Sequence, residues 1–164
     1  MSAEFAPYAL DPFGPSANPG AYVACEASER ARAILERSLD EGRVAAVMGP
    51  PGHGKTLLLR LLGGREQERA RIAHVPFSTL EPDELFALAL NELGVSRPGP
   101  PREVLAAVAR ELAPVGGVVI LVDDANAMPD ACANALAALY QELGGALRVA
   151  SGAGGTRVEL RVPL

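Results

Sequence analysis

One eight-residue stretch constrains this chain more than any other feature: Gly49-Pro50-Pro51-Gly52-His53-Gly54-Lys55-Thr56. It matches the pattern G-x-x-x-x-G-K-[ST] at every fixed position. The apolar segment 43–48 before it is typical of a short buried strand, and the leucine-rich segment 57–62 after it is typical of a buried helix that stops at Gly63-Gly64. Strand, glycine loop and helix is the order in which phosphate-binding loops occur, so we predict that this stretch is one.

The residue types of the loop suit that chemistry. Glycines let backbone N–H groups curl around a phosphate with no Cβ in the way, and the following helix points its positive N-terminal end at the anion. We expect Lys55 to reach the β- and γ-phosphates, the Thr56 hydroxyl to bind Mg²⁺, and His53 to contribute its backbone N–H. The predicted nucleotide-binding residues are Gly49, Pro50, Pro51, Gly52, His53, Gly54, Lys55, Thr56 and Leu57.

The use of lysine supports this prediction. The chain has 15 basic residues, and Lys55 is the only lysine among them. A compact, flexible ammonium group therefore stands at the one position where a phosphate loop uses it. The alternative is a turn rich in Gly and Pro that connects a strand to a helix and binds nothing.

Composition limits the other possibilities. The chain has 164 residues and is 49% hydrophobic, which predicts one globular domain. No apolar run is long enough for membrane insertion, and the N-terminus lacks the pattern of a signal peptide, so we expect a cytoplasmic protein. Cys25 and Cys132 are expected to be reduced thiols. The net charge of −5 argues against broad electrostatic capture of nucleic acid.

Predicted strands alternate with predicted helices along the chain. Apolar patterns indicate helices over 27–41, 81–93, 101–113 and 130–143, and strands over 43–48, 71–77, 118–122, 147–151 and 158–162. This alternation predicts an α/β fold, a three-layer αβα sandwich with a mainly parallel sheet of the P-loop type. We divide the chain into a core domain over 27–164 and an arm rich in Pro and aromatic residues over 1–26. The arm either packs on the core or is partly disordered.

The continuous apolar strand 118–122 is followed directly by two acidic residues, Asp123 and Asp124. The carboxyl end of a buried parallel strand lies in the crevice where open α/β sheets bind ligands. We therefore predict that Asp123 orders the water shell of the Mg²⁺ that bridges the phosphates, and that Asp124 polarises the attacking water. A helix cap or loop aspartate is an equal alternative for Asp124. The predicted catalytic residues are thus Lys55 and Asp124, and the predicted metal-binding residues are Thr56 and Asp123.

Three further polar residues are weaker candidates. Asn126 either orients water or the γ-phosphate, or simply forms a turn. Ser151 ends a strand that should neighbour the site, where it either senses the γ-phosphate or is a surface serine. We expect His74 to be a packed strand residue and not a ligand.

The order of these motifs resembles a known family. The chain carries Pro12-Phe13, then Ser16-x-Asn18-Pro19, Tyr22, a helix, GPPGHGKT at 49–56 and VVILVDDAN at 118–126. From about Pro12 to Leu164 it resembles the AAA+ ATPases of the ExeA-like group, which includes type II secretion and transposition ATPases. The resemblance implies Mg²⁺-dependent ATP hydrolysis coupled to a protein partner or a homo-oligomer, with Asp124 in the place of the family's catalytic Glu.

Three departures from the family pattern keep a second function open. Asp124 is one methylene shorter than Glu, and Arg157 is the only arginine available in the region that commonly supplies an arginine finger. The chain ends at Pro163-Leu164, where the family would begin its helical lid, so we expect a core with no lid. A nucleotide-dependent binding switch of the STAND type, with little turnover, is therefore the alternative. A small-molecule kinase is disfavoured because nothing resembles a phosphoryl-acceptor pocket.

Overall fold

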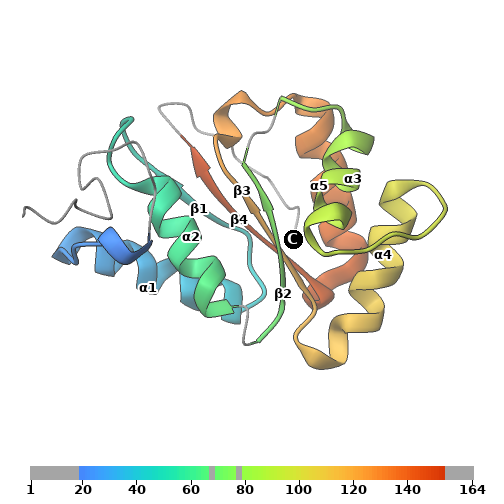
Figure 1. Ribbon diagram of the computed structural model, residues 1–164, viewed down its shortest axis with the longest axis horizontal. Coiled ribbons are helices and arrows are strands. Elements are labelled where there is room, and N and C mark those ends of the chain that lie inside the picture. Colours follow the sequence, from blue (N-terminus) through green and yellow to red (C-terminus); the bar gives the residue numbers. More distant parts are fainter. Residues whose placement is uncertain (1–18, 67–68, 77–78, 154–164) are drawn as a thin grey trace, which may run out of the picture.

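The computed structural model describes residues 19–66, 69–76 and 79–153 (Figure 1). The longer helices are α1 (Glu26–Asp40), α2 (Lys55–Glu66), α3 (Pro82–Glu92), α4 (Pro101–Leu112) and α5 (Asp130–Leu143). The strands are β1 (Ala45–Met48), β2 (Arg71–Val75), β3 (Val118–Val122) and β4 (Leu147–Ala153). Short 3₁₀ turns include η1 (Pro19–Ala21), η2 (Ala113–Val115), η3 (Ala125–Ala127) and η4 (Gly144–Ala146).

The strands form one parallel sheet in the order β1-β4-β3-β2. The strand before the glycine loop therefore neighbours β4, and β4 neighbours the strand that ends at Asp123. Val47 on β1 is paired with Gly152 on β4, and Val122 on β3 with Ser151. The glycine loop consequently lies at the edge of the sheet formed by the carboxyl ends of the strands. Asp123 and the end of β4 lie at the same edge.

Helices cover both faces of the sheet. In Figure 1, α1 and α2 lie on one side, and α3, α4 and α5 on the other. The α1–α2 side holds the core of Leu35, Leu39, Leu59, Leu62, Val119, Leu121 and Ala150. The opposite side holds a larger core that includes Val118, Ile120, Val122, Leu136, Leu139 and Val149. All five residues of β3 are buried, as expected of a strand that is covered on both faces. The predicted three-layer fold is confirmed.

The helix after the glycine loop is longer than predicted. It begins at Lys55 and continues through Gly63 and Gly64 to Glu66, so the expected end at these glycines is wrong. A Cβ at Gly63 would lie 2.9 Å from Leu121 Cδ1 and 3.7 Å from Ile72 Cγ2. Gly63 therefore lets α2 approach β2 and β3 closely, and burial outweighs the low helix propensity of glycine.

The other predicted elements within the described residues occur with boundaries that differ by up to two residues. β1 begins at Ala45 instead of 43, β2 ends at Val75 instead of 77, and β4 continues past 151 to Ala153. The predicted strand 158–162 and most of the arm lie outside the described residues. Within the described ranges, no helix is long and apolar enough to cross a membrane. Cys25 and Cys132 are both free thiols.

Candidate functional site

The glycine loop connects β1 to the first turn of α2. Two of its glycines have left-handed backbone angles, with φ of 80° at Gly52 and 77° at Gly54, and a Cβ at either position would meet nothing within 4 Å. The loop is thus an open, glycine-dependent curve above the N-terminus of α2. The first N–H groups of a helix have no intrahelical acceptor, so the turn that begins at Lys55 presents donors to the space inside this curve.

The Lys55 side chain folds back into the loop. Its Nζ donates hydrogen bonds to the carbonyl oxygens of Gly49 at 2.9 Å and Pro50 at 2.8 Å. The ammonium group is therefore held within the loop where a bound phosphate would lie beside it. An ammonium group has three N–H donors, so these two hydrogen bonds leave one donor for a phosphate oxygen. Thr56 and Leu57 follow in the first turn of α2.

Asp123 is brought to the loop by the sheet. Its side chain is only 6% exposed, and its backbone N–H donates to Val75 O at 2.9 Å, which extends the β2–β3 pairing by one residue. Its Oδ1 accepts a hydrogen bond from the Asp124 backbone N–H at 3.1 Å. This bond fixes one carboxylate oxygen and leaves the other for a ligand.

Gly152 joins the two halves of the site. A Cβ on Gly152 would lie 3.3 Å from Asp123 Oδ1, 3.6 Å from Lys55 Cβ and 3.1 Å from Leu59 Cδ1. The Asp123 carboxylate, the base of the Lys55 side chain and Leu59 therefore surround the same face of Gly152 and leave no room for a side chain there. The sequence prediction missed this residue because it ended the strand at Ser151. A glycine inside a strand indicates close approach of another group, and that signal was available.

The remaining candidates are distributed around the same edge. Asp124 is exposed and has φ of 49°, the only positive φ of a non-glycine residue within the described chain. Asn126 lies in η3 directly beyond it and is exposed. Ser151 is buried and, by strand alternation, faces the α3–α5 side, whereas Gly152 faces α2. The structure thus does not bring the Ser151 side chain together with Lys55 and Asp123. Arg157 lies outside the described residues.

The residues present fit Mg²⁺ bound together with a nucleotide. Among the described residues, no group of three His, Cys, Asp or Glu side chains can hold a metal ion. Mg²⁺ commonly uses one or two protein oxygens and completes its shell with phosphate oxygens and water. The Thr56 hydroxyl in the first turn of α2 and the Asp123 carboxylate after β3 are oxygen donors of this kind.

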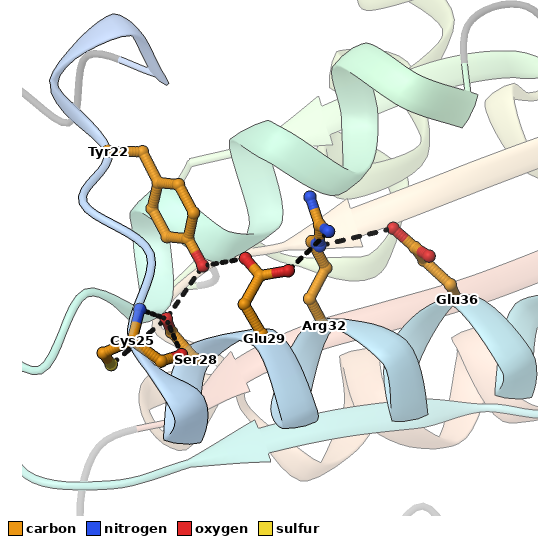
Figure 2. A network of polar contacts seen from close by, with 6 residues as sticks. All are labelled: Tyr22, Cys25, Ser28, Glu29, Arg32 and Glu36. Carbon is orange, nitrogen blue, oxygen red and sulfur yellow. Dashed lines mark hydrogen bonds and ion pairs between the residues drawn. The ribbon is translucent and has the colours of Figure 1, made fainter.

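The described end of the N-terminal arm is tied to α1. The Tyr22 hydroxyl donates to Glu29 Oε1 at 2.6 Å and lies 2.8 Å from Ser28 Oγ, and Arg32 bridges Glu29 and Glu36 (Figure 2). The hydrogen bond to the Glu29 carboxylate raises the pKa of Tyr22. This network holds the segment before α1 against the helix layer that also contains α2.

A buried ion pair connects α2 and β4 at the ends of these two elements that lie away from the candidate site. Arg148 at the start of β4 is 9% exposed, and its Nη1 lies 3.3 Å from Oε2 of Glu66, which is 1% exposed and ends α2. Arg148 Nη2 also donates to Gly116 O at 2.9 Å. Because α2 begins at Lys55 and β4 carries Gly152, this pair sets how the two elements lie against each other.

Together, the parallel sheet, the glycine loop and the adjacent carboxylate define a P-loop α/β domain. A family model described as "AAA domain" matches residues 37–150, more than half of the chain. The protein therefore belongs to the AAA domain family, a class of P-loop ATPases. The finer assignment to the ExeA-like group is not part of this finding.

Two solved structures are similar to this chain at low sequence identity. PCH-2 from C. elegans is 17% identical with a TM-score of 0.50, and the match covers 82% of this chain and 39% of that chain. A mutant RuvB from Thermotoga maritima is 13% identical with a TM-score of 0.46, over 85% of this chain and 42% of that chain. This chain thus matches less than half the length of either protein. No curated protein matches it.

Proposed function

We propose that this domain binds ATP with Mg²⁺ and hydrolyses it. The observation that carries the proposal is that Asp123 Oδ1 and Lys55 Cβ both lie within 3.6 Å of the position that a Cβ on Gly152 would take, while the Lys55 ammonium group lies in the glycine loop. A cation in the loop and a carboxylate beside the start of α2 suit a phosphate and its bound metal ion. We further propose that the domain works in the cytoplasm within an assembly, with copies of itself or with a protein partner, and that it belongs to the ExeA-like group of AAA+ ATPases.

Each side chain has a role in the proposed reaction. Lys55 and the N–H groups at the start of α2 bind the β- and γ-phosphate oxygens and stabilise the charge on the transferring phosphoryl group. Bound Mg²⁺, held by Thr56 and Asp123, would neutralise further charge on the same oxygens. Asp124 accepts a proton from water as its oxygen attacks the γ-phosphorus. The bond from the γ-phosphorus to the bridging oxygen breaks, and ADP and phosphate leave.

Calorimetric titration with ATP and with ADP, each in the presence of Mg²⁺, tests this proposal. We expect saturable binding of both nucleotides, tighter for ATP, accompanied by phosphate release from ATP. A folded protein that binds neither nucleotide would contradict the proposal, because the loop would then be only a structural turn.

The backbone at Asp124 favours a second candidate, a nucleotide-dependent switch with little turnover. Residues other than glycine rarely adopt its left-handed conformation, and Asp and Asn tolerate it better than longer side chains do. The structure therefore selects a short side chain at the position where the family has Glu. A carboxylate on a shorter side chain reaches less far toward an attacking water, which supports slow hydrolysis.

Asp124→Asn distinguishes hydrolysis from switching. Asn has the same shape and tolerates the same backbone angles, but its amide cannot act as a base. If Asp124 is the general base, we expect turnover to fall by about 100-fold or more, with Mg²⁺-ATP affinity changed by less than about threefold. Phosphate release and calorimetry measure the two quantities. Equal turnover in both proteins would show that Asp124 does not activate water.

A further inference from the structure

Helix α1 has an exposed apolar face in addition to the face that packs on the sheet. Ile34 is 59% exposed, and Val23, just before the helix, is 84% exposed. Ala27 and Ala31 lie on the same face as Ile34, because residues at i, i+4 and i+7 align along a helix. We call Val23, Ala27, Ala31 and Ile34 the outer face of α1. Exposed apolar side chains that lie together mark candidate contact surfaces, and the proposed nucleotide site uses none of these four.

A groove with a charged border runs along the outer face. It has a volume of about 540 Å³, and its lining residues are Glu26, Ala27, Arg30, Ala31 and Ile34. Among the described residues, the ion pairs of α1 join its other charged side chains and leave Glu26 and Arg30 out. An exposed acid and an exposed base therefore stand beside the apolar groove, one turn apart and both available to a partner.

The outer face is complementary to itself in one arrangement. When two copies of a helix pack antiparallel about a twofold axis, residues equally far from the axis on opposite sides lie across from each other. An axis at the level of Ser28 and Glu29 forms three kinds of contact at once, each of them twice: Val23 with Ile34, Ala27 with Ala31, and Glu26 with Arg30.

These contacts suit one another in size and charge. The small side chains of Ala27 and Ala31 lie near the axis, where they let the two helices approach closely. The larger Val23 and Ile34 cover the ends of the contact, and opposite charges meet along its border. The segment that carries Val23 is held against α1 by the hydrogen bonds of Tyr22 (Figure 2), so this part of the face is already ordered in the single chain.

We propose that the outer face of α1 binds the same face of a second copy of this chain, with the two helices antiparallel. The charge pattern identifies the occupant, because a second copy supplies both the acid for Arg30 and the base for Glu26 in the register that also matches the apolar side chains. This inference rests on the proposed function, in which the domain works with copies of itself or with a protein partner, and it selects the first. One helix pair buries an area at the low end for specific interfaces, so the dimer is expected to form reversibly with rising concentration.

Two charge reversals, alone and mixed, test this contact. Glu26→Arg and Arg30→Glu each place like charges at both ion-pair positions of the dimer, whereas a dimer of one variant with the other again has opposite charges at both. Sedimentation velocity over a range of concentrations gives the dissociation constant of each protein and of the equimolar mixture. Glu103→Arg is the matched control, because Glu103 is also an exposed acid in the first turn of a helix, α4, and its reversal changes the net charge equally.

We expect each single reversal to raise the dimer dissociation constant by about tenfold, since two exposed ion pairs become two repulsive contacts, and the mixture to return close to the value of the unaltered protein. Glu103→Arg should leave the constant unchanged. An unaltered protein that stays monomeric, single variants that dimerise as well as it does, or a mixture no tighter than its components would each overturn the inference. An equal effect of Glu103→Arg would also overturn it, because net charge would then be the cause.

Ile34→Glu separates this inference from nucleotide binding. It places a charge in the apolar contact and lies outside the glycine loop, so we expect a monomer whose affinity for Mg²⁺-ATP, measured by calorimetry, equals that of the unaltered protein. A chain that forms the α1 dimer but binds no ATP would contradict the proposed nucleotide site and leave the dimer contact standing. A chain that binds ATP but never dimerises would contradict only the contact. The charge reversals keep the test decisive if Ile34→Glu does not fold.

Discussion

Lys55→Ala should weaken Mg²⁺-ATP binding by about 10- to 100-fold. A hydrogen bond to a charged group contributes about 1.5–3 kcal/mol, and every ~1.4 kcal/mol is a factor of ten in affinity. The Lys55 ammonium group donates to the carbonyl oxygens of Gly49 and Pro50, both within its own loop. Its loss should therefore remove a phosphate contact while leaving the core, and hence the thermal unfolding midpoint, nearly unchanged.

The control for this experiment is Arg71→Ala. Arg71 is an exposed cation at the first position of β2, at the opposite edge of the sheet from the loop. Its removal changes the net charge as Lys55→Ala does, so unchanged affinity in this variant shows that the effect at Lys55 is local. Calorimetric affinity for Lys55→Ala equal to that of the unaltered protein would refute the assignment of the phosphate site.

Arg148→Met should produce the largest loss of stability, about 3–5 kcal/mol in the free energy of unfolding. It leaves the Glu66 carboxylate, which is 1% exposed, buried without its cation. It also removes the donor to Gly116 O. Urea denaturation followed by circular dichroism measures the change.

The double variant Glu66→Leu with Arg148→Met tests the cause. A buried ion pair replaced by apolar side chains of similar volume is often close to neutral in stability, because no charge remains unpaired. We therefore expect the double variant to recover most of the loss seen in Arg148→Met. If the double variant is as unstable as the single one, the loss comes from packing around Arg148 and not from the unpaired carboxylate. The double variant also keeps the test informative if Arg148→Met does not fold.

Local sequence was sufficient for the loop, the strand before Asp123 and the fold class. The G-x-x-x-x-G-K-[ST] pattern fixes a backbone shape through residues that are neighbours in the chain, so no distant contact is needed to predict it. The apolar run 118–122 likewise predicts a strand buried on both faces, as β3 is. Helix 130–143 was predicted with the bounds that α5 has.

Tertiary packing decided the features that depend on distant residues. The low helix propensity of glycine predicts that the helix ends at Gly63. Helix α2 nevertheless continues, because the glycine lets it pack against Leu121 and Ile72. The role of Gly152 exists only because β4 lies between β1 and β3, which brings Lys55 and Asp123 beside it. The pattern of apolar residues predicts each strand but not the order of the strands in the sheet. That order determines which side chains from different strands come together.

The sequence by itself therefore determined the outline of the candidate site, a glycine loop followed by an acidic strand end in an α/β fold. Only the tertiary structure placed the carboxylate of Asp123 against Gly152, left His74 Nε2 buried on the same face, and paired Glu66 with Arg148 across 82 residues of chain. The physical reason is that a motif is encoded by adjacent residues, whereas burial and charge pairing are set by which surfaces the fold presses together.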